Sequence, residues 1–387
     1  MEYKKINELT AVVTGGTPST RKNEYWDNGD IPWLQSGCCQ NCDVDSTEKY
    51  ITKEGYNNSS THMMPADTVM IALTGATAGK VGYLKFEACG NQSITGILPC
   101  ESLNQRYLFF YLLSQREKIL ADCVGGAQAH ISQSYVKNMT IPILAIKEQE
   151  QIVGELTKLS NIVSLRQEEI QQLDALIKAR FVELFGDENN SKNWDVVNVE
   201  EVADVQVGVV IKPSQYYTDK SEGVRTFRSL NIGAGFIKDN DWVYFTKEGH
   251  QKNSKSILKK DDLLIVRSGA PGTACVVTEE YAGCNAVDII IAHPDCKKVN
   301  PYYLCTFTNM PHGKKQIDEG IGGAAQQHFN VGKYNKLQLM LPPKTLQDEF
   351  VGFIKQVNKS KFDTMTFAPI YAIINLYLHT YFYQGRR

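Results

Sequence analysis

The sequence lacks the features that would place the protein in a membrane or in an export pathway. No run of about 18 uncharged apolar residues is present, and a membrane-spanning helix needs about that length. The first residues, Met1-Glu2-Tyr3-Lys4-Lys5, are not followed by the apolar segment of a signal peptide. These absences predict a cytoplasmic protein without membrane contact.

Cysteines are also few, with ten in 387 residues, and only Cys38, Cys39 and Cys42 lie close together in the sequence. The Cys39-x-x-Cys42 spacing occurs in zinc sites, but neither a second CxxC pair nor a histidine pair accompanies it. Cytosolic proteins rarely hold disulfides, so free thiols in a loop are the favoured interpretation and a metal site is the weaker alternative. We therefore predict no resident metal.

Motifs of known catalytic centres are missing as well. The sequence contains no GxSxG, no HExxH and none of the Asp/Asn-Pro-Pro-aromatic tetrapeptides that amino-methyltransferases use. Gly75-Ala-Thr-Ala-Gly79-Lys80 resembles a phosphate-binding loop, but it is one residue short, and Val81 stands where Ser or Thr would hold Mg²⁺. A turn whose backbone N–H groups face an anion is the preferred interpretation. A nucleotide-using enzyme remains the alternative, and we predict no catalytic residue.

The composition is that of a folded protein, with 42% hydrophobic and 22% charged residues, and the length fits two or three domains. The net charge of −2 gives the whole chain no attraction for polyanions. Residues 205–260, however, carry ten Lys and Arg against five acids, whereas residues 1–60 carry six against nine. A polyanion site must therefore be a local face, and the second half shows it more clearly.

One unit is present twice in the chain. Four landmarks recur in the same order, and their offset rises from 194 to 198 residues. They are residues 63–70 with 257–264, Gly75 with Gly269, residues 125–130 with 322–328, and Gln149 with Gln347. Several matches in one order indicate a tandem duplication.

Each copy has the same predicted plan, which is a β-rich domain followed by a long helix, so the fold class is α+β. The expected strands are residues 68–73, 81–84 and 139–144 in the first copy and 263–266, 287–291 and 337–341 in the second. Before the last of these strands, each copy contains one expected helix, at residues 106–121 and 301–318.

The long helix after the first copy is predicted from Lys147 to the helix stop at Gly186, which gives it a length of about 60 Å. Its seam repeats with heptad spacing and is interrupted only by Arg166 and Arg180. The apolar seam residues are Ile152, Leu156, Leu159, Val163, Ile170, Leu173, Ile177 and Leu184.

A second helix, beginning near residue 345, is the expected partner of the first in an antiparallel coiled coil. Its apolar seam consists of Phe350, Ile354 and Val357. Lys361 interrupts this seam, and Pro369 should kink or break the helix before it resumes at residues 370–383. We expect two helical pieces rather than one straight rod.

Several of these motifs resemble the specificity subunits of type I restriction–modification enzymes. Gly15-Gly16-Thr17-Pro18-Ser19 and Ile31-Pro32-Trp33-Leu34 look like the opening of a target recognition domain. Gln128-Ala-His-Ile-Ser132 and Glu148-Gln149-Glu-Gln-Ile152 are similar to the boundary between that domain and the conserved helix. The chain departs from the pattern at Leu346, which stands where a glutamate would be expected.

The resemblance implies four segments and a function. Target recognition domains would span residues 1–144 and 188–343, a conserved central helix residues 145–187, and a C-terminal helical region residues 344–387. Such a subunit is not catalytic: each domain recognises half of a bipartite, asymmetric site on double-stranded DNA, and the helices fix the spacer between the halves. They also recruit two modification subunits, which methylate adenine, and then the restriction subunits. S-adenosylmethionine, ATP and Mg²⁺ belong to those partners, and this chain would hold no cofactor. A stand-alone DNA-binding or scaffold protein without a methyltransferase partner is the alternative.

Polar loop residues are the candidates for DNA contact, because Arg and Gln suit bidentate contacts to bases, and Lys and Ser suit phosphates. In the first copy they are Ser19, Thr20, Arg21, Lys22, Gln35, Ser36, Thr74, Thr77, Lys80, Gln128 and His130. In the second copy they are Lys212, Arg225, Arg228, Ser229, Asn231, Arg267, Ser268, Gln326 and His328. A solvated loop side chain is the alternative for each. Arg228 and Arg267 are preferred because each lies beside a predicted strand in the basic half, and Gln35 matches Arg228 at an offset of 193.

Overall fold

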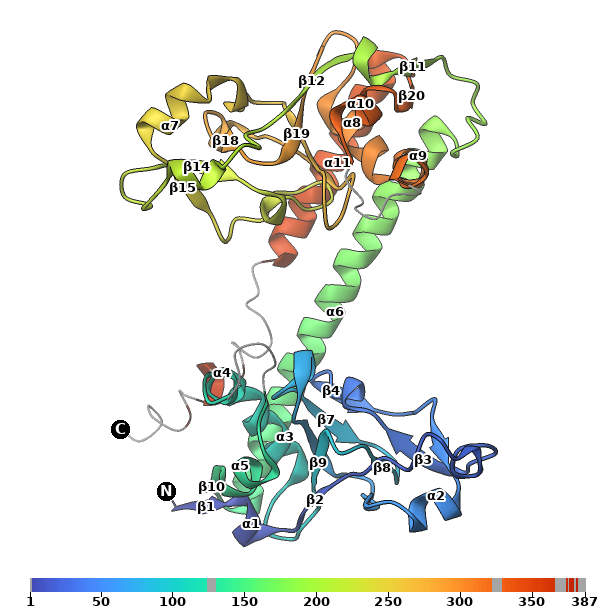
Figure 1. The fold of residues 1–387 in the computed structure, drawn as a ribbon, viewed down its shortest axis with the longest axis vertical. Helices are drawn as coiled ribbons and strands as arrows, with labels where there is room; N and C mark the ends of the chain where they lie inside the picture. The colour runs from blue at the N-terminus through green and yellow to red at the C-terminus, as the bar shows by residue number, and fades with distance from the viewer. Residues whose placement is uncertain are drawn as a thin grey trace. The chain divides into compact units, whose positions relative to one another are not determined.

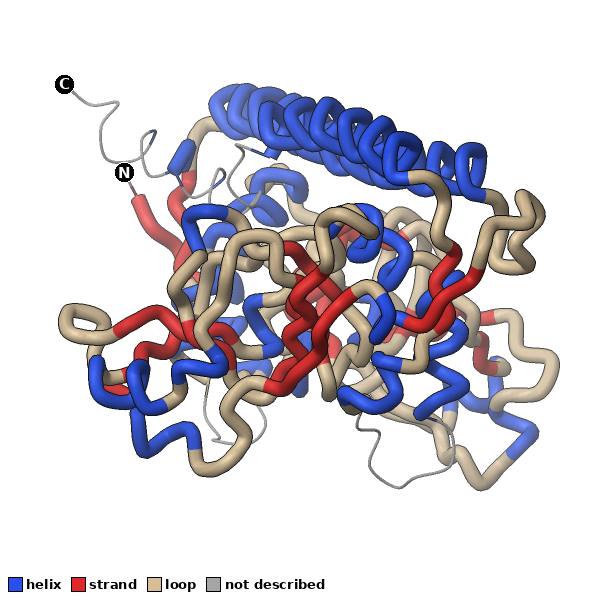
Figure 2. The backbone as a smooth tube through the Cα atoms, turned by 90° about the horizontal axis from the view of Figure 1, so that it is seen from above, coloured by secondary structure: helices blue, strands red, loops and turns tan. Residues whose placement is uncertain are grey.

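The computed structural model describes residues 2–123, 130–321, 329–365, 374, 376–378 and 381. The chain divides into two compact units, which we call the first unit (residues 1–167 and 366–387) and the second unit (residues 168–365). Both combine short strands with short helices (red and blue in Figure 2), so the predicted α+β class is confirmed. No helix of the described ranges has the length and apolar character needed to cross a membrane.

The first unit contains a five-stranded sheet of order β2-β9-β6-β7-β4, in which only the β4–β7 pair is parallel. Its strands are β2 (Val12–Thr14), β4 (Cys42–Val44), β6 (Val69–Ala72), β7 (Val81–Leu84) and β9 (Ile94–Ile97). A smaller sheet of order β5-β3-β8 contains β3 (Ile31–Leu34), β5 (Tyr50–Ile51) and β8 (Cys89–Gly90). Strand β1 (Glu2–Lys5) pairs with β10 (Thr140–Ile143). Every residue of β6, β7 and β9 is buried, and β6 and β7 are accordingly continuous apolar runs, whereas β9 contains the polar Thr95.

The second unit repeats most of this topology, but among the described residues its larger sheet has no counterpart of β4 and its smaller sheet has one strand more. Its larger sheet has the order β12-β19-β16-β17 and its smaller one the order β13-β15-β14-β18, in which β14 runs parallel to β18 as β3 does to β8. The larger sheet consists of β12 (Ala203–Val207), β16 (Leu263–Val266), β17 (Ala274–Val276) and β19 (Ile289–Pro294). The smaller consists of β13 (Tyr217–Thr218), β14 (Val224–Phe227), β15 (Val243–Phe245) and β18 (Asn285–Ala286). Strand β11 (Val196–Asn198) pairs with β20 (Gln338–Met340). The shared strand order agrees with a duplication.

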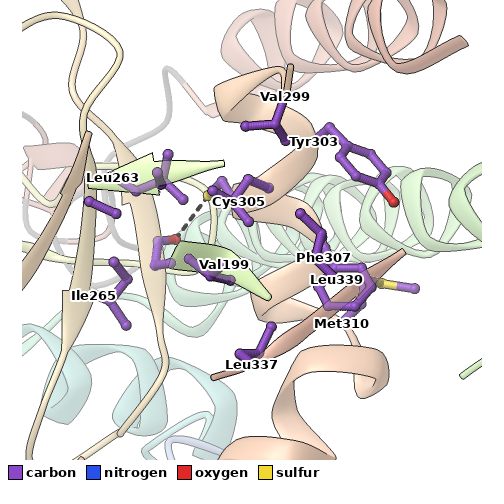
Figure 3. Packing of buried hydrophobic residues seen from close by; sticks show 14 of the residues in the cluster. Val199, Leu263, Ile265, Val299, Tyr303, Cys305, Phe307, Met310, Leu337 and Leu339 are labelled. Atoms are coloured by element: carbon purple, nitrogen blue, oxygen red, sulfur yellow. Dashed lines mark hydrogen bonds between the residues drawn. The ribbon is translucent and has the colours of Figure 1, made fainter. Parts of the chain in front are cut away.

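Short helices complete each unit. In the first they are α1 (Ile6–Leu9), α2 (Lys53–Asn57), α3 (Gln105–Ser114), α4 (Arg116–Ala121) and α5 (Gln133–Asn138). In the second they are α7 (Lys247–Lys252), α8 (Pro301–Asn309), α9 (Pro311–Ile321) and α10 (Val331–Asn335). In Figure 3, residues of α8 such as Tyr303 and Cys305 pack in one cluster with Leu263 and Ile265 of β16.

The prediction of one helix at residues 106–121 and one at residues 301–318 was wrong, because each is a pair of helices. In the second unit the cause is Pro311, whose ring and missing N–H end α8. In the first unit α3 is buried over most of its length, whereas the only buried residue of α4 is Ile119. The two helices therefore present different faces to the core. Ile119 packs on Gly79, where a Cβ atom would lie 2.9 Å from its side chain. The chain therefore bends so that α4 covers the turn before β7.

A buried glutamine joins each globular part to its long helix. Gln149, near the start of α6 (Ile146–Phe185), accepts a hydrogen bond from the Asn104 N–H (2.8 Å) and donates to a backbone carbonyl just before the helix (2.9 Å). Gln347, near the start of α11 (Lys344–Met365), accepts from the Asn300 N–H and donates to the equivalent carbonyl, both at 2.8 Å. The matched glutamines of the sequence are therefore matched structural anchors.

Helix α6 is one unbroken helix of 40 residues (Figure 1) and ends before Gly186, whose φ of +89° is typical of a residue that stops a helix. Near its start, the seam residues Ile152 and Leu156 are fully buried, as predicted. Near its end the buried residues are instead Phe181 and Phe185, which a strict heptad seam missed. An α-helix of 3.6 residues per turn drifts by about 20° per heptad, so the core-facing positions change along a straight helix.

Helix α11 packs antiparallel against the last turns of α6 within the second unit. The ring of Phe350 lies 5.4 Å from that of Phe181, and Glu349 accepts a hydrogen bond from Arg180 at 2.9 Å. Further along, Lys361 pairs with Asp174. Two of the charged residues that interrupt the predicted seams, Arg180 and Lys361, are therefore used in ion pairs between the two helices.

In the first unit, the described residues near the C-terminus pack against the other end of α6. Ile374 and Leu378 are buried in the same cluster as Ile152, and the Tyr377 hydroxyl donates to Glu155. Pro369 and the break predicted there lie outside the described residues.

Candidate nucleic-acid interface

A cleft of about 810 Å³ opens on the surface of the first unit. It is lined by Thr17, Thr20, Asn23, Trp26, Asn28, Gly29, Trp33, Gln35, Glu48, Lys49, Tyr50, Asn91 and Gln92. Five of these side chains are amides, each with both a donor and an acceptor group, which is the chemistry that base edges require. Of the residues proposed from the sequence, Thr20 and Gln35 lie in this cleft.

The walls of the cleft are held by side-chain contacts that the sequence did not reveal. Trp33 is buried, its Nε1–H donates to the Gly16 carbonyl at 3.0 Å, and the ring of Trp26 stands edge-on to it at 5.0 Å. Thr17 donates to Gln92 at 2.5 Å, which joins the loop before the cleft to the turn between β8 and β9. Both tryptophans therefore shape the wall.

The loop beside the cleft carries four predicted contacts, and Ser19, Thr20, Arg21 and Lys22 are all exposed. The Lys22 ammonium donates to the Tyr25 hydroxyl at 2.9 Å, and this hydrogen bond raises the pKa of the lysine. The Lys22 side chain is exposed, so the loop can present positive charge to a phosphate.

The turn at residues 75–80 brings a second group of predicted contacts together. Thr77 donates to the Thr74 carbonyl at 3.2 Å, Lys80 donates to Gln40 at 2.6 Å, and Thr74 forms a β-bridge with His130. This turn leads into strand β7, whereas a phosphate-binding loop leads into a helix N-terminus. The structure therefore removes the basis for a nucleotide-using enzyme. The candidate Gln128 lies outside the described residues.

In the second unit, Arg228 lies at the start of a loop that Asn231 holds from inside. Asn231 is buried, accepts from the Arg228 N–H at 2.9 Å and donates to the Asn240 carbonyl at 2.6 Å. This amide is used inside the loop, which is a structural role and not the surface role expected for it. Arg228 is half-buried and donates through Nη2 to the Asp241 carbonyl at 2.5 Å, while its buried Nε has no hydrogen-bond partner among the described residues.

Two other arginines proposed from the sequence are held by the protein itself. Arg225 lies against the stacked rings of Trp242 and Tyr281, 5.1 and 5.4 Å from their centroids, and two acids lie 3.8 Å from its guanidinium. Arg267 pairs with Asp288 at 2.5 Å and is 18% exposed. These contacts give both residues a structural role and leave less of each guanidinium for an external ligand.

The remaining candidates of the second unit differ in exposure. Lys212 is exposed and has a φ of +43°, in the left-handed region, whereas Ser229 and Ser268 are half-buried. Ser36 of the first unit is half-buried too. The candidates Gln326 and His328 lie outside the described residues.

Gln35 and Arg228 occupy the same place in the two units. Gln35 follows β3 and Arg228 follows β14, and each leads into a short 3-10 turn. The residue before each accepts a hydrogen bond of 2.9 Å, from the Asn91 N–H in the first unit and from the Val287 N–H in the second. Equivalent positions therefore carry an amide in one unit and a guanidinium in the other.

All ten cysteines are free, including the Cys38, Cys39 and Cys42 cluster. Cys39 is buried, and its pKa is raised by a hydrogen bond with Cys38 and by burial, whereas the same hydrogen bond lowers the pKa of Cys38. Within the described ranges, His, Cys, Asp and Glu side chains form no group of three or more that could hold a metal.

The sequence matches the family described as type I restriction modification DNA specificity domain over residues 1–175 and 191–369. The chain belongs to this family. Its members are the non-catalytic components of type I restriction–modification systems that provide DNA sequence recognition. Two matched segments agree with the duplication of the chain.

Individual specificity subunits are similar to this one over different lengths. The Escherichia coli EcoR124I/EcoR124II specificity subunit is 33% identical over 169 residues, which cover 42% of this chain and 42% of that protein. The Methanocaldococcus jannaschii MjaIX specificity subunit is 21% identical over 380 residues, 92% of this chain and 86% of that protein. The similarity therefore covers less than half of the first relative and most of the second.

Solved structures share the fold of this specificity subunit. The S subunit of a type I system from M. genitalium has a TM-score of 0.53 at 15% identity and covers 98% of this chain and 94% of its own. A chain from a study of complex assembly and conformational transition of the type I R-M system has a TM-score of 0.54 at 15% identity, with coverage of 98% and 96%.

Most residues that line the cleft of this specificity subunit were not predicted from the sequence. Asn91 and Gln92 come from the turn between β8 and β9, Tyr50 comes from the edge strand β5, and Lys49 directly precedes that strand. The only local sequence feature that could have indicated the cleft was the polar turn between two apolar strands. Such turns are common in β-rich domains, so this feature does not identify a binding site.

Proposed function

We propose that the two units recognise the two halves of one bipartite, asymmetric DNA site. Target recognition domains at residues 1–144 and 188–343 would each contact one half. The central helix at residues 145–187 would pair with the C-terminal helical region at residues 344–387 as a coiled coil that sets the spacer.

The proposal rests on one observation: equivalent positions of the two duplicated units carry chemically different side chains. Gln35 in the cleft of the first unit corresponds to Arg228 in the second. Glutamine suits the N6 and N7 atoms of adenine, whereas arginine suits the O6 and N7 atoms of guanine. Two units of one topology but different side chains would recognise different sequences, which an asymmetric site requires.

Partner recruitment forms the second part of the proposal. Ile162 and Leu165 lie three residues apart on α6, on one face of the helix, and are 46% and 63% exposed. Apolar side chains so exposed on neighbouring turns of a helix are typical of a protein–protein contact. We assign this face to the modification subunits, two of which would carry S-adenosylmethionine and methylate adenine in the cytoplasm. Restriction subunits that use ATP and Mg²⁺ would then join.

Co-expression with a type I modification subunit tests this assignment. The expected result is a complex that methylates adenine in a bipartite sequence with S-adenosylmethionine. The Leu165→Ser variant should lose the complex, and Gln171→Ser, at an exposed position on another face of α6, should keep it. DNA binding without any associated modification subunit would instead support a stand-alone DNA-binding protein.

A further inference from the structure

The second unit carries apolar side chains at the place where the first unit has its polar cleft. The loops that enter this place are matched by their hydrogen bonds. Gly16 N–H donates to the Gly90 carbonyl in the first unit, and Val209 N–H donates to the Ala286 carbonyl in the second, both at 2.8 Å. Thr17, which lines the cleft, therefore corresponds to Val210.

The apolar loop and Arg228 leave the same edge of the second unit. Val209 forms a parallel bridge with Val287, and the Val287 N–H donates to the Phe227 carbonyl at 2.9 Å. These three segments run side by side with Val287 in the middle. Neighbouring strands lie about 4.8 Å apart, so Val210 and Arg228 begin about 10 Å from each other.

The apolar side chains of Val210, Ile211 and Leu230 are unusually exposed to solvent. Ile211 is 80% exposed, the highest value for any large apolar residue of the described ranges, and Val210 is 48% exposed. Leu230, two residues after Arg228, is 60% exposed. The first unit has Gly37 at the place of Leu230, with open space around it. An apolar protrusion is thus specific to the second unit.

Positive charge accompanies this surface. Lys212 follows Ile211 directly and is exposed, with its backbone in the left-handed region at a φ of +43°. A residue other than glycine rarely adopts that conformation, and such strain is concentrated at functional sites. Lys212 follows Ile211, and Arg228 lies two residues before Leu230, so a cation accompanies each apolar segment. That combination suits a ligand with anionic edges and an apolar centre.

We propose that Val210, Ile211 and Leu230 contact the 5-methyl groups of thymine in the major groove of the second half-site. The inference rests on the proposed function, because it assigns one half-site to this unit. The thymine methyl is the apolar group that a base pair presents in the major groove, and a neighbouring phosphate matches Lys212, while Arg228 remains the candidate for a guanine contact. The second unit therefore recognises thymine through shape and apolar contact, where the first unit uses amides.

Deoxyuridine tests the proposal, because it lacks the 5-methyl group and keeps the hydrogen-bonding atoms of thymine. Binding of the complex with its modification subunits is measured on duplexes in which thymine is replaced by deoxyuridine in one half-site at a time. Replacement in the second half-site should weaken binding about fourfold for each methyl contacted, as expected for one methyl-sized apolar contact. Replacement in the first half-site should have no effect of this kind.

Variants then assign the effect to the apolar loop. Ile211→Ser should reduce the preference for the thymine duplex over the deoxyuridine duplex, and Val196→Ser, at an exposed apolar residue of β11, should leave that preference unchanged. A wild-type complex that does not distinguish the two duplexes in the second half-site overturns the inference, as does a second half-site without thymine. An unchanged preference in Ile211→Ser also overturns the inference and directs attention to a protein partner for this surface. Failure to bind any bipartite duplex would instead contradict the proposed function.

Discussion

Replacement of Gln347 by leucine should destabilise the second unit through two backbone groups and not through lost packing. Gln347 is fully buried, and leucine fills a similar volume without an amide. The Asn300 N–H would lose its acceptor at 2.8 Å, and the Pro342 carbonyl would lose its donor at 2.8 Å. Both groups lie near the start of α11, where water has little access.

Each buried backbone group left without a partner costs about 1–3 kcal/mol. Two such groups give an expected loss of about 2–6 kcal/mol in the free energy of unfolding of the second unit. For a unit of this size, 1 kcal/mol corresponds to about 2–4 °C in Tm, so a loss near 3 kcal/mol lowers Tm by about 6–12 °C. Gln149→Leu should have the same effect on the first unit.

Thermal unfolding measures the loss of stability, and hydrogen exchange measures the exposure of the Asn300 amide. Tm should fall for Gln347→Leu, and exchange of the Asn300 amide should become faster. Gln356→Leu, on the exposed side of α11, serves as the control and should change Tm by little. A Gln347→Leu variant as stable as this control would refute the argument that the glutamine anchors the helix.

Three further expectations follow from the geometry. Gly272→Ala should lower the free energy of unfolding by about 2–4 kcal/mol, because φ is +73° and the new Cβ would lie 2.4 Å from Ile317. Gly269→Ala, where φ is +83° and the space is open, should lower it by only about 1 kcal/mol. Arg228→Ala should relax specificity at one position of the second half-site by about 1–3 kcal/mol, and an equal loss on all sequences would show a phosphate contact instead. Leu165→Ser should weaken subunit association in sedimentation or co-purification without changing Tm by more than about 2 °C, because the side chain is 63% exposed in this chain.

Elements with a strong local signal were predictable from the sequence. Strands β6, β7 and β16 are unbroken apolar runs, and α6 ends at the glycine that its pattern indicated. The heptad seam failed toward the end of α6, because a strict repeat of 3.5 residues departs from 3.6 residues per turn by about 80° over four heptads. Phe181 and Phe185 therefore face the core where Leu184 was expected.

The candidate interface was predictable only as a set of loops. Polar residues near turns mark such loops, but the sequence does not show which side chains the protein uses internally. Asn231 and Arg225 have the residue types of DNA contacts, yet Asn231 is buried by its own loop and Arg225 packs against two aromatic rings. Conversely, Ile211 and Leu230 have no polar group, and only their exposure in the folded unit distinguishes them.

The central claim is that each unit recognises its own half of one DNA site. Residues 1–144 can be exchanged for the first recognition domain of another specificity subunit, and the methylated sequences then determined in cells that carry the modification subunit. The account predicts a new sequence in one half-site and an unchanged sequence and spacer elsewhere. A change in both halves would contradict it.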